Sequence, residues 1–122
     1  MDEVASRDQI EKFLAKVVDC VEKGQFYYVN RSANLRTAAE LEISQVVVVD
    51  VVQNLTYKDY YRGPRSDPER SYESVCEFGT TIDETEVYIK LALVERYKHM
   101  ICNCISFHIP ERPIEYPLKN GE

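Results

Sequence analysis

The chain lacks any apolar run long enough to span a bilayer, and it contains no low-complexity segment. Its first residues, Met1-Asp2-Glu3, are acidic and lack the basic and apolar regions of a signal peptide. These absences predict a cytoplasmic protein that makes no membrane contact. With 122 residues and 44% hydrophobic content, the chain can build one compact domain around one core. We expect a single domain over residues 1–122, with an ordered core of about 7–108 and a C-terminal tail of 109–122.

Positive charge is also scarce. The chain has 15 Lys and Arg against 21 Asp and Glu, which gives a net charge of −6. Proteins that bind nucleic acid over a broad surface depend on an excess of positive charge. This composition excludes that class, so any contact with RNA or DNA must be confined to a local patch.

The cysteine pattern offers neither a disulfide framework nor a metal site. Cys20, Cys76, Cys102 and Cys104 lie within helical or strand patterns and not in turn-rich loops, so we expect buried, reduced thiols. Cys102 and Cys104 are separated by one residue, whereas zinc knuckles place their cysteines further apart, in a turn that lets both sulfurs converge. The sequence therefore predicts no metal and no cofactor.

Hydrophobic periodicity predicts helices in the N-terminal third. Ser6 and Gln9 form a capping box, apolar residues recur at helical spacing from Ile10 to Val21, and Gly24 stands where a helix would end. We predict a helix over 7–23. A short strand over 25–30 and a second helix over 33–41 should follow.

Residues 43–55 fit two structures. The valine-rich run 46–52 has high strand propensity, but its valines and Leu55 also form a helical stripe. Propensity alone favours a strand. Residues 56–72 contain Gly63 and two prolines, so we expect a loop there, with at most a helical turn at its start.

Three further strands are predicted over 74–78, 85–94 and 100–108. Strict alternation in the middle one sends four aliphatic side chains to the core face: Val87, Ile89, Leu91 and Leu93. An antiparallel return of the last strand would place three apolar side chains inward: Ile101, Ile105 and Phe107. Tyr88, Lys90, Ser106 and His108 would then share the open face of the sheet.

The order of these parts resembles the MqsR family of type II toxins, which are small RelE-like ribonucleases that pair with a zinc-containing antitoxin. The resemblance covers roughly 9–108 and rests on three segments: 55–64 (Leu-Thr-Tyr-Lys-Asp-Tyr-Tyr-Arg-Gly-Pro), 87–90 (Val-Tyr-Ile-Lys) and 105–108 (Ile-Ser-Phe-His). It implies an α+β fold in which N-terminal helices pack on one face of a small antiparallel sheet whose open face cuts RNA. It also implies that residues 43–55 are helical.

The resemblance assigns candidate site residues, and only one of them, Tyr88, matches the family outright. Arg62 stands where the family has a lysine, and Tyr88 matches the family's tyrosine, with an expected role in orienting the phosphate or the base. Glu73 falls nearest to a family glutamine, although another register assigns Glu77 instead. His108 ends the last strand, where the family often has a lysine.

These residue types are the ones that metal-free RNA cleavage needs. The reaction requires a base for the 2′-hydroxyl proton, an acid for the leaving 5′-oxygen, and cations for the charge that grows on phosphorus oxygens. Glu73 or Glu77 is the expected base, and His108 is the expected acid because histidine ordinarily titrates near neutrality. Arg62 and Lys90 would clamp the phosphate. The products would be a 2′,3′-cyclic phosphate and a 5′-hydroxyl.

Three functions are consistent with these features. The favoured one is an mRNA-cleaving endoribonuclease toxin, whose antitoxin is encoded next door. The net charge of −6 and the altered positions favour instead a catalytically degenerate member that binds protein or nucleic acid. A single-stranded nucleic-acid binder that stacks bases on Tyr60, Tyr61 and Tyr72 is weaker, because these rings lack a surrounding basic groove.

Overall fold

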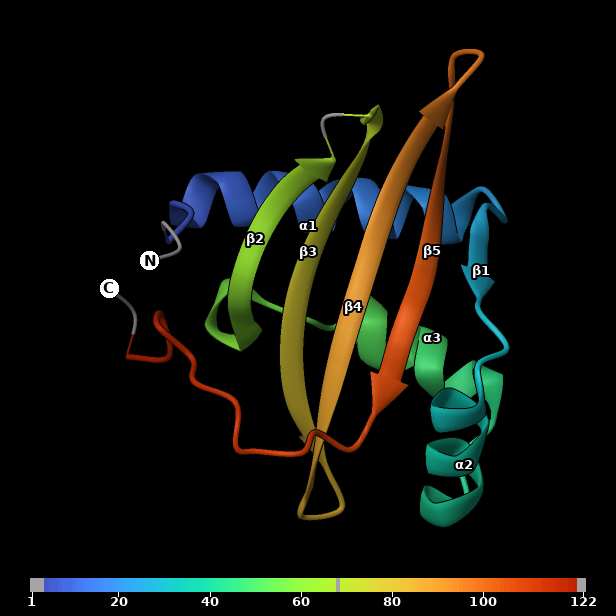
Figure 1. The fold of residues 1–122 in the computed structure, drawn as a ribbon, viewed down its shortest axis with the longest axis vertical. Helices are drawn as coiled ribbons and strands as arrows, with labels where there is room; N and C mark the ends of the chain where they lie inside the picture. Colours follow the sequence, from blue (N-terminus) through green and yellow to red (C-terminus); the bar gives the residue numbers. More distant parts are fainter. Residues whose placement is uncertain (1–3, 68, 121–122) are drawn as a thin grey trace.

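The computed structural model describes residues 4–67 and 69–120. The helices α1 and α3 lie behind one face of a five-stranded sheet, and the opposite face is open (Figure 1). The strand order is β1-β5-β4-β3-β2, with β1 parallel to β5 and every other pair antiparallel. In chain order the elements are α1 (Arg7–Glu22), β1 (Phe26–Tyr28), α2 (Ser32–Leu41), α3 (Gln45–Gln53), the 3-10 turn η1 (Tyr57–Asp59), β2 (Tyr60–Asp67), β3 (Arg70–Ile82), β4 (Thr85–Arg96) and β5 (His99–His108).

The α+β fold class is confirmed, with one difference. The sheet is mixed and not purely antiparallel, because the short strand β1 joins its edge in parallel. The predicted strands over 85–94 and 100–108 are neighbours, as expected. No helix in the described part of the chain is both long and apolar enough to cross a membrane.

Helix α1 begins where the capping box predicted. The backbone N–H of Gln9 donates to Ser6 Oγ at 3.1 Å, and the N–H of Ser6 donates to Gln9 Oε1 at 2.9 Å. Both bonds satisfy amides that lack partners inside the helix. The helix buries one apolar stripe against the sheet: Ile10, Phe13, Leu14, Val17 and Cys20.

The valine-rich segment is the helix α3, so the strand that propensity favoured is wrong and the helix implied by the family resemblance is confirmed. Val48 and Val52 are buried in the core, whereas Val46 is 77% exposed. The strand propensities of the amino acids span a range of only about 1 kcal/mol. Burying one stripe of a short helix against a sheet outweighs that difference.

The stretch 60–67 was predicted as a loop, and it is the edge strand β2. Its pairing with β3 shifts register between Tyr60 and Arg62 and again between Arg62 and Arg65. Such an irregular edge tolerates proline, because the outer side of the strand needs no ladder hydrogen bonds. Gly63 is required here: its φ is +105°, and a Cβ would lie 2.8 Å from the carbonyl oxygen of Val75.

Strand β5 carries a bulge at Ile105, because Ser106 pairs with Lys90 whereas Cys104 pairs with Leu91. The extra residue reverses the alternation along the strand. Cys104 therefore faces the core before the bulge and Phe107 faces it after the bulge. The inward placement of Phe107 is confirmed.

The other two inward predictions for this strand are wrong. Ile105 is the bulged residue, and Ile101 pairs with Val94 on the open side. Ser106 and His108 lie opposite Lys90 and Tyr88, so both share the open face as predicted.

Asn34 of α2 holds the bulge in place. Its side-chain amide donates to the carbonyl oxygens of Ile105 at 2.9 Å and Val29 at 3.0 Å, and its Oδ1 accepts from the N–H of Phe107 at 2.9 Å. Asn34 is fully buried. A backbone bulge that cannot pair with β4 therefore finds its partners in one side chain.

Replacing Asn34 with alanine should lower the free energy of unfolding by about 3 kcal/mol, because three buried backbone groups would lose their hydrogen-bond partner. Urea denaturation measures the difference. Asn54→Ala is the matched control, since Asn54 bonds only its own exposed turn of α3, and it should cost less than about 1 kcal/mol. Equal effects of the two variants would contradict this role of Asn34.

The tail after β5 crosses the lower ends of β4 and β3 toward β2 (Figure 1). The N–H of Ile114 donates to Glu86 Oε1 at 2.9 Å, and the hydroxyl of Tyr116 donates to Glu86 Oε2 at 2.8 Å. Gly79 makes room, because a Cβ there would lie 2.5 Å from Ile114 Cδ1. Leu118 joins the hydrophobic core. The tail is therefore anchored to the open face of the sheet.

Candidate active site on the open face of the sheet

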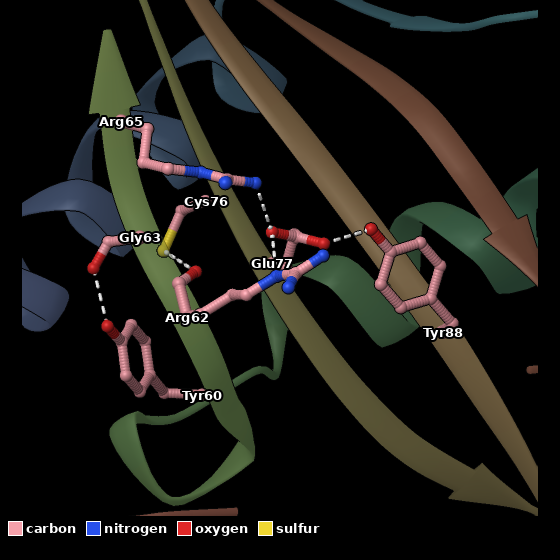
Figure 2. Close-up of polar contacts among 7 residues, drawn as sticks. All are labelled: Tyr60, Arg62, Gly63, Arg65, Cys76, Glu77 and Tyr88. Carbon is pink, nitrogen blue, oxygen red and sulfur yellow. Dashed lines mark hydrogen bonds and ion pairs between the residues drawn. The ribbon is translucent and has the colours of Figure 1, made fainter. Parts of the chain in front are cut away.

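Glu77 of β3 is the centre of a polar cluster on the open face, although it is only 1% exposed. Arg62 Nε donates to its Oε2 at 2.6 Å, Arg65 Nη2 donates to the same oxygen at 2.9 Å, and the hydroxyl of Tyr88 donates to Oε1 (Figure 2). The side chains of Arg62 and Arg65 are 38% and 53% exposed. A buried carboxylate thus orders two arginines whose outer ends reach solvent.

The electrostatics of the cluster fix the protonation of Glu77. Burial raises the pKa of Glu77, but hydrogen bonds from Arg62 and Tyr88 and the charges of both arginines outweigh burial, so the pKa lies below its ordinary value. Glu77 is therefore ionised at neutral pH and fully engaged. It suits the role of an anchor and not that of a proton acceptor.

Tyr88 and Arg62 keep their protons for related reasons. Burial, followed by the hydrogen bond to Glu77 and its charge, raises the pKa of Tyr88 well above its ordinary value. The hydrogen bond to Glu77 raises the pKa of Arg62. Tyr88 is thus a hydrogen-bond donor, and cannot serve as a base near neutral pH.

The cluster is a local positive patch on an acidic protein. Two guanidinium groups face the one carboxylate of Glu77, and Lys90 lies opposite Glu77 in the pairing of β3 with β4. Arg31 Nη1 donates to Ser106 Oγ at 3.4 Å, and Ser106 is the partner of Lys90 on β5. Such a concentration of cations can bind a phosphate. The net negative charge of the whole chain would repel one.

His108 completes the cluster. It lies opposite Tyr88 in the sheet, and the two ring centroids are 5.3 Å apart. Its Nδ1 is 3.2 Å from the carbonyl oxygen of Ile109. Because a carbonyl only accepts, this contact is a hydrogen bond when Nδ1 carries a proton, and Nε2 is then the nitrogen that can exchange one.

Comparison with known families agrees with this architecture. A family model described as "Motility quorum-sensing regulator, toxin of MqsA" matches residues 11–109, which is most of the chain. The chain belongs to the MqsR toxin family. It is therefore a toxin of a toxin-antitoxin pair, which implies an antitoxin partner. Searches of curated proteins and of solved structures give no significant match.

In this MqsR-family toxin, four of the predicted site residues come together: Arg62, Tyr88, Lys90 and His108. Glu73 does not join them and needs correction. It pairs with Val94, four residues before Glu77 on β3, or about 13 Å away at about 3.3 Å per residue. The alternative register assigned Glu77, which lies at the centre of the cluster and whose lowered pKa does not suit the role of base.

Sequence reasoning missed two arginines of the MqsR-family site. Arg65 was not among the candidates, because the strand β2 that carries it was predicted as a loop. Arg31 reaches Ser106 from a position 75 residues earlier in the chain. No local sequence pattern predicts this contact of Arg31. Recognising β2 as the partner of β3 would have pointed to Arg65.

Two other expectations concern aromatic rings and thiols of this MqsR-family chain. Tyr60 is fully buried, so it cannot serve as a stacking platform for bases. All four cysteines are buried, as predicted, and burial raises the pKa of Cys76 and of Cys104 to about 12. Within residues 4–67 and 69–120, no three His, Cys, Asp or Glu side chains gather in a way that could hold a metal ion.

Proposed function

We propose that this MqsR-family toxin is an endoribonuclease that cleaves messenger RNA without a metal ion. The observation that carries the proposal is the cluster around Glu77, which orders Arg62 and Arg65 beside Lys90 and His108 on an open face. Cations held in place before substrate arrives stabilise developing charge without reorganisation. On a chain of net charge −6, this local concentration of positive charge suits contact with a phosphate.

The proposed reaction is an internal transphosphorylation. The 2′-oxygen of the RNA attacks the adjacent phosphorus, the bond from phosphorus to the 5′-oxygen breaks, and a 2′,3′-cyclic phosphate and a 5′-hydroxyl form. Arg62 and Lys90 stabilise the charge on the phosphorus oxygens. Protonated His108 gives the proton of Nε2 to the leaving 5′-oxygen. Because Glu77 is ionised and fully engaged, the 2′-hydroxyl proton goes to solvent.

The antitoxin is proposed to be a zinc-containing protein encoded next to this chain, as the family resemblance implies. Its expected effect is relief of toxicity when the two are produced together. The catalytically degenerate binding module is the second candidate function, favoured by the net charge of −6 and by Arg62 in place of a lysine. A purified protein that leaves RNA intact would make that second function the better account.

RNA cleavage by the purified protein should persist in EDTA and weaken as salt is added. Cleavage should persist in EDTA because no step of the proposed reaction uses a metal ion. It should weaken with salt because the attraction between RNA and a chain of net charge −6 depends on a few local cations, which salt screens. Gel electrophoresis of a defined transcript, with and without EDTA across a salt series, measures both effects. Loss of cleavage in EDTA that magnesium restores would contradict the proposed chemistry.

A further inference from the structure

The C-terminal tail builds a cavity next to the cation cluster. The cavity has a volume of about 280 Å³ and lies between the edge of the sheet and the tail. Its walls come from three residues of the body and three of the tail: Val4, Tyr61, Arg62, Glu115, Tyr116 and Pro117. Four of these six, Val4 and the three tail residues, lie outside the matched segment 11–109. The cavity is therefore a feature that the family match alone does not provide.

We propose that this cavity is a nucleobase-binding pocket, which takes a base beside the scissile phosphate and favours bases that carry an amino group. The inference rests on the proposed function for its RNA substrate. Arg62 belongs to both places, since its Nε donates to Glu77 and its side chain lines the cavity. A base in the cavity and a phosphate at the cluster would therefore be neighbours on one RNA strand.

Two aromatic rings line the cavity. The guanidinium of Arg62 lies 4.9 Å from the ring centroid of Tyr61, which fixes this ring beside the cluster. The hydroxyl of Tyr116 is bonded to Glu86 at 2.8 Å, which holds the second ring in place. Stacking on such a ring is worth about 1–3 kcal/mol for a base, whatever its identity. The rings thus supply affinity and no selectivity.

Glu115 supplies the selectivity. Among the described residues that line the cavity, its exposed side chain is the one acidic group, and an ionised carboxylate only accepts hydrogen bonds. It can accept from the amino group of adenine, cytosine or guanine. Uracil has no amino group, and its N3–H donor stands between two carbonyl oxygens that the carboxylate would repel. The cavity should therefore disfavour uracil.

The tail is anchored well enough to hold this geometry. Ile114 and Tyr116 both bond Glu86, and Leu118 packs into the core, so the lining residues lie between fixed points. Gly79 permits the close approach, because any side chain there would collide with Tyr116. A site whose walls are fixed before the ligand arrives loses less entropy on binding.

The test is the cleavage of four oligoribonucleotides that differ only in the base next to the scissile bond, with each side of the bond tested in turn. Wild-type protein should disfavour uracil on one side by about tenfold in kcat/KM. Glu115→Gln should lose most of this preference, because the amide offers uracil a donor. Glu111→Gln, an exposed glutamate of the same tail outside the cavity, should behave as wild type.

Binding of the four nucleoside monophosphates, followed by NMR, separates failure of the pocket from failure of the proposed function. Uniform cleavage of all four oligoribonucleotides, unchanged by Glu115→Gln, would overturn the pocket and leave the ribonuclease standing. Selective nucleotide binding that Glu115→Gln abolishes, with no cleavage by any protein, would support the pocket and overturn the ribonuclease. Neither selective binding nor selective cleavage would overturn the pocket outright.

Discussion

Replacing Arg62 with alanine should reduce the rate of RNA cleavage by about a hundredfold to a thousandfold. Arg62 is the cation that Glu77 holds most closely, through a 2.6 Å hydrogen bond from Nε, and its side chain remains 38% exposed to solvent. Its loss would remove charge stabilisation that exists before the substrate binds. Single-turnover kinetics on a short oligoribonucleotide measures this effect, free of product release.

Arg62→Lys is the matched control. Lysine is the residue that the family resemblance implies at this position, and it keeps the charge while losing the planar fork that bonds Glu77. It should therefore keep most of the cleavage activity. The alanine variant should lose only about 1 kcal/mol of stability, because Arg65 and Tyr88 still bond Glu77. An Arg62→Ala protein that cleaves RNA at the wild-type rate would remove Arg62 from the site.

Replacing Glu77 with glutamine should change both stability and activity. The folded state holds the pKa of Glu77 below its ordinary value. Its ionised form therefore stabilises the fold fully above that ordinary value, and this contribution is lost as the pH falls through the lower, folded pKa. At pH 7 the glutamine variant should be less stable by about 1–3 kcal/mol, and the gap should narrow below about pH 4.

Urea denaturation at neutral and acid pH measures this narrowing. The variant should also cleave RNA at least about tenfold more slowly, because both arginines and Tyr88 lose the group that orients them. Glu73→Gln, on the same strand but opposite Val94, is the control and should leave cleavage unchanged. If the gap in stability between wild type and Glu77→Gln is the same at both pH values, Glu77 does not carry a lowered pKa.

The sequence predicts elements whose own periodicity decides their structure. The helix α1 and the strand β4 follow from spacing alone, and Tyr88 and Lys90 follow from alternation in β4. Helix α3 does not, because its valines favour a strand locally and only packing against the sheet selects the helix. The family resemblance supplied that information.

Contacts between distant segments explain most of what the sequence could not predict. The bulge in β5 depends on Asn34, which lies 71 residues before Ile105, so Ile101 was assigned to the wrong face. The open face was correctly predicted for His108, because this residue follows the bulge and keeps its alternation with Phe107. The packing of the tail on the sheet could not be predicted for the same reason, since Tyr116 bonds Glu86 from 30 residues away.

Strand β2 was missed for a local reason. Gly63 and Pro64 ordinarily end a regular element, but an irregular edge strand accommodates both. Missing β2 removed Arg65 from the candidates, and the choice between Glu73 and Glu77 as the residue at the family's glutamine position stayed open. In the structure Arg62 pairs with Glu77, and Glu73 pairs with Val94.

The most direct test of the central claim is the chemistry of the RNA ends that the purified toxin produces in EDTA. Mass spectrometry of the fragments should find a 2′,3′-cyclic phosphate on one side of each cut and a 5′-hydroxyl on the other, with yields that collapse in Arg62→Ala protein prepared in the same way. Fragments that carry 3′-hydroxyl and 5′-phosphate ends, or cyclic phosphates formed equally by the Arg62→Ala protein, would contradict a ribonuclease site built around Glu77.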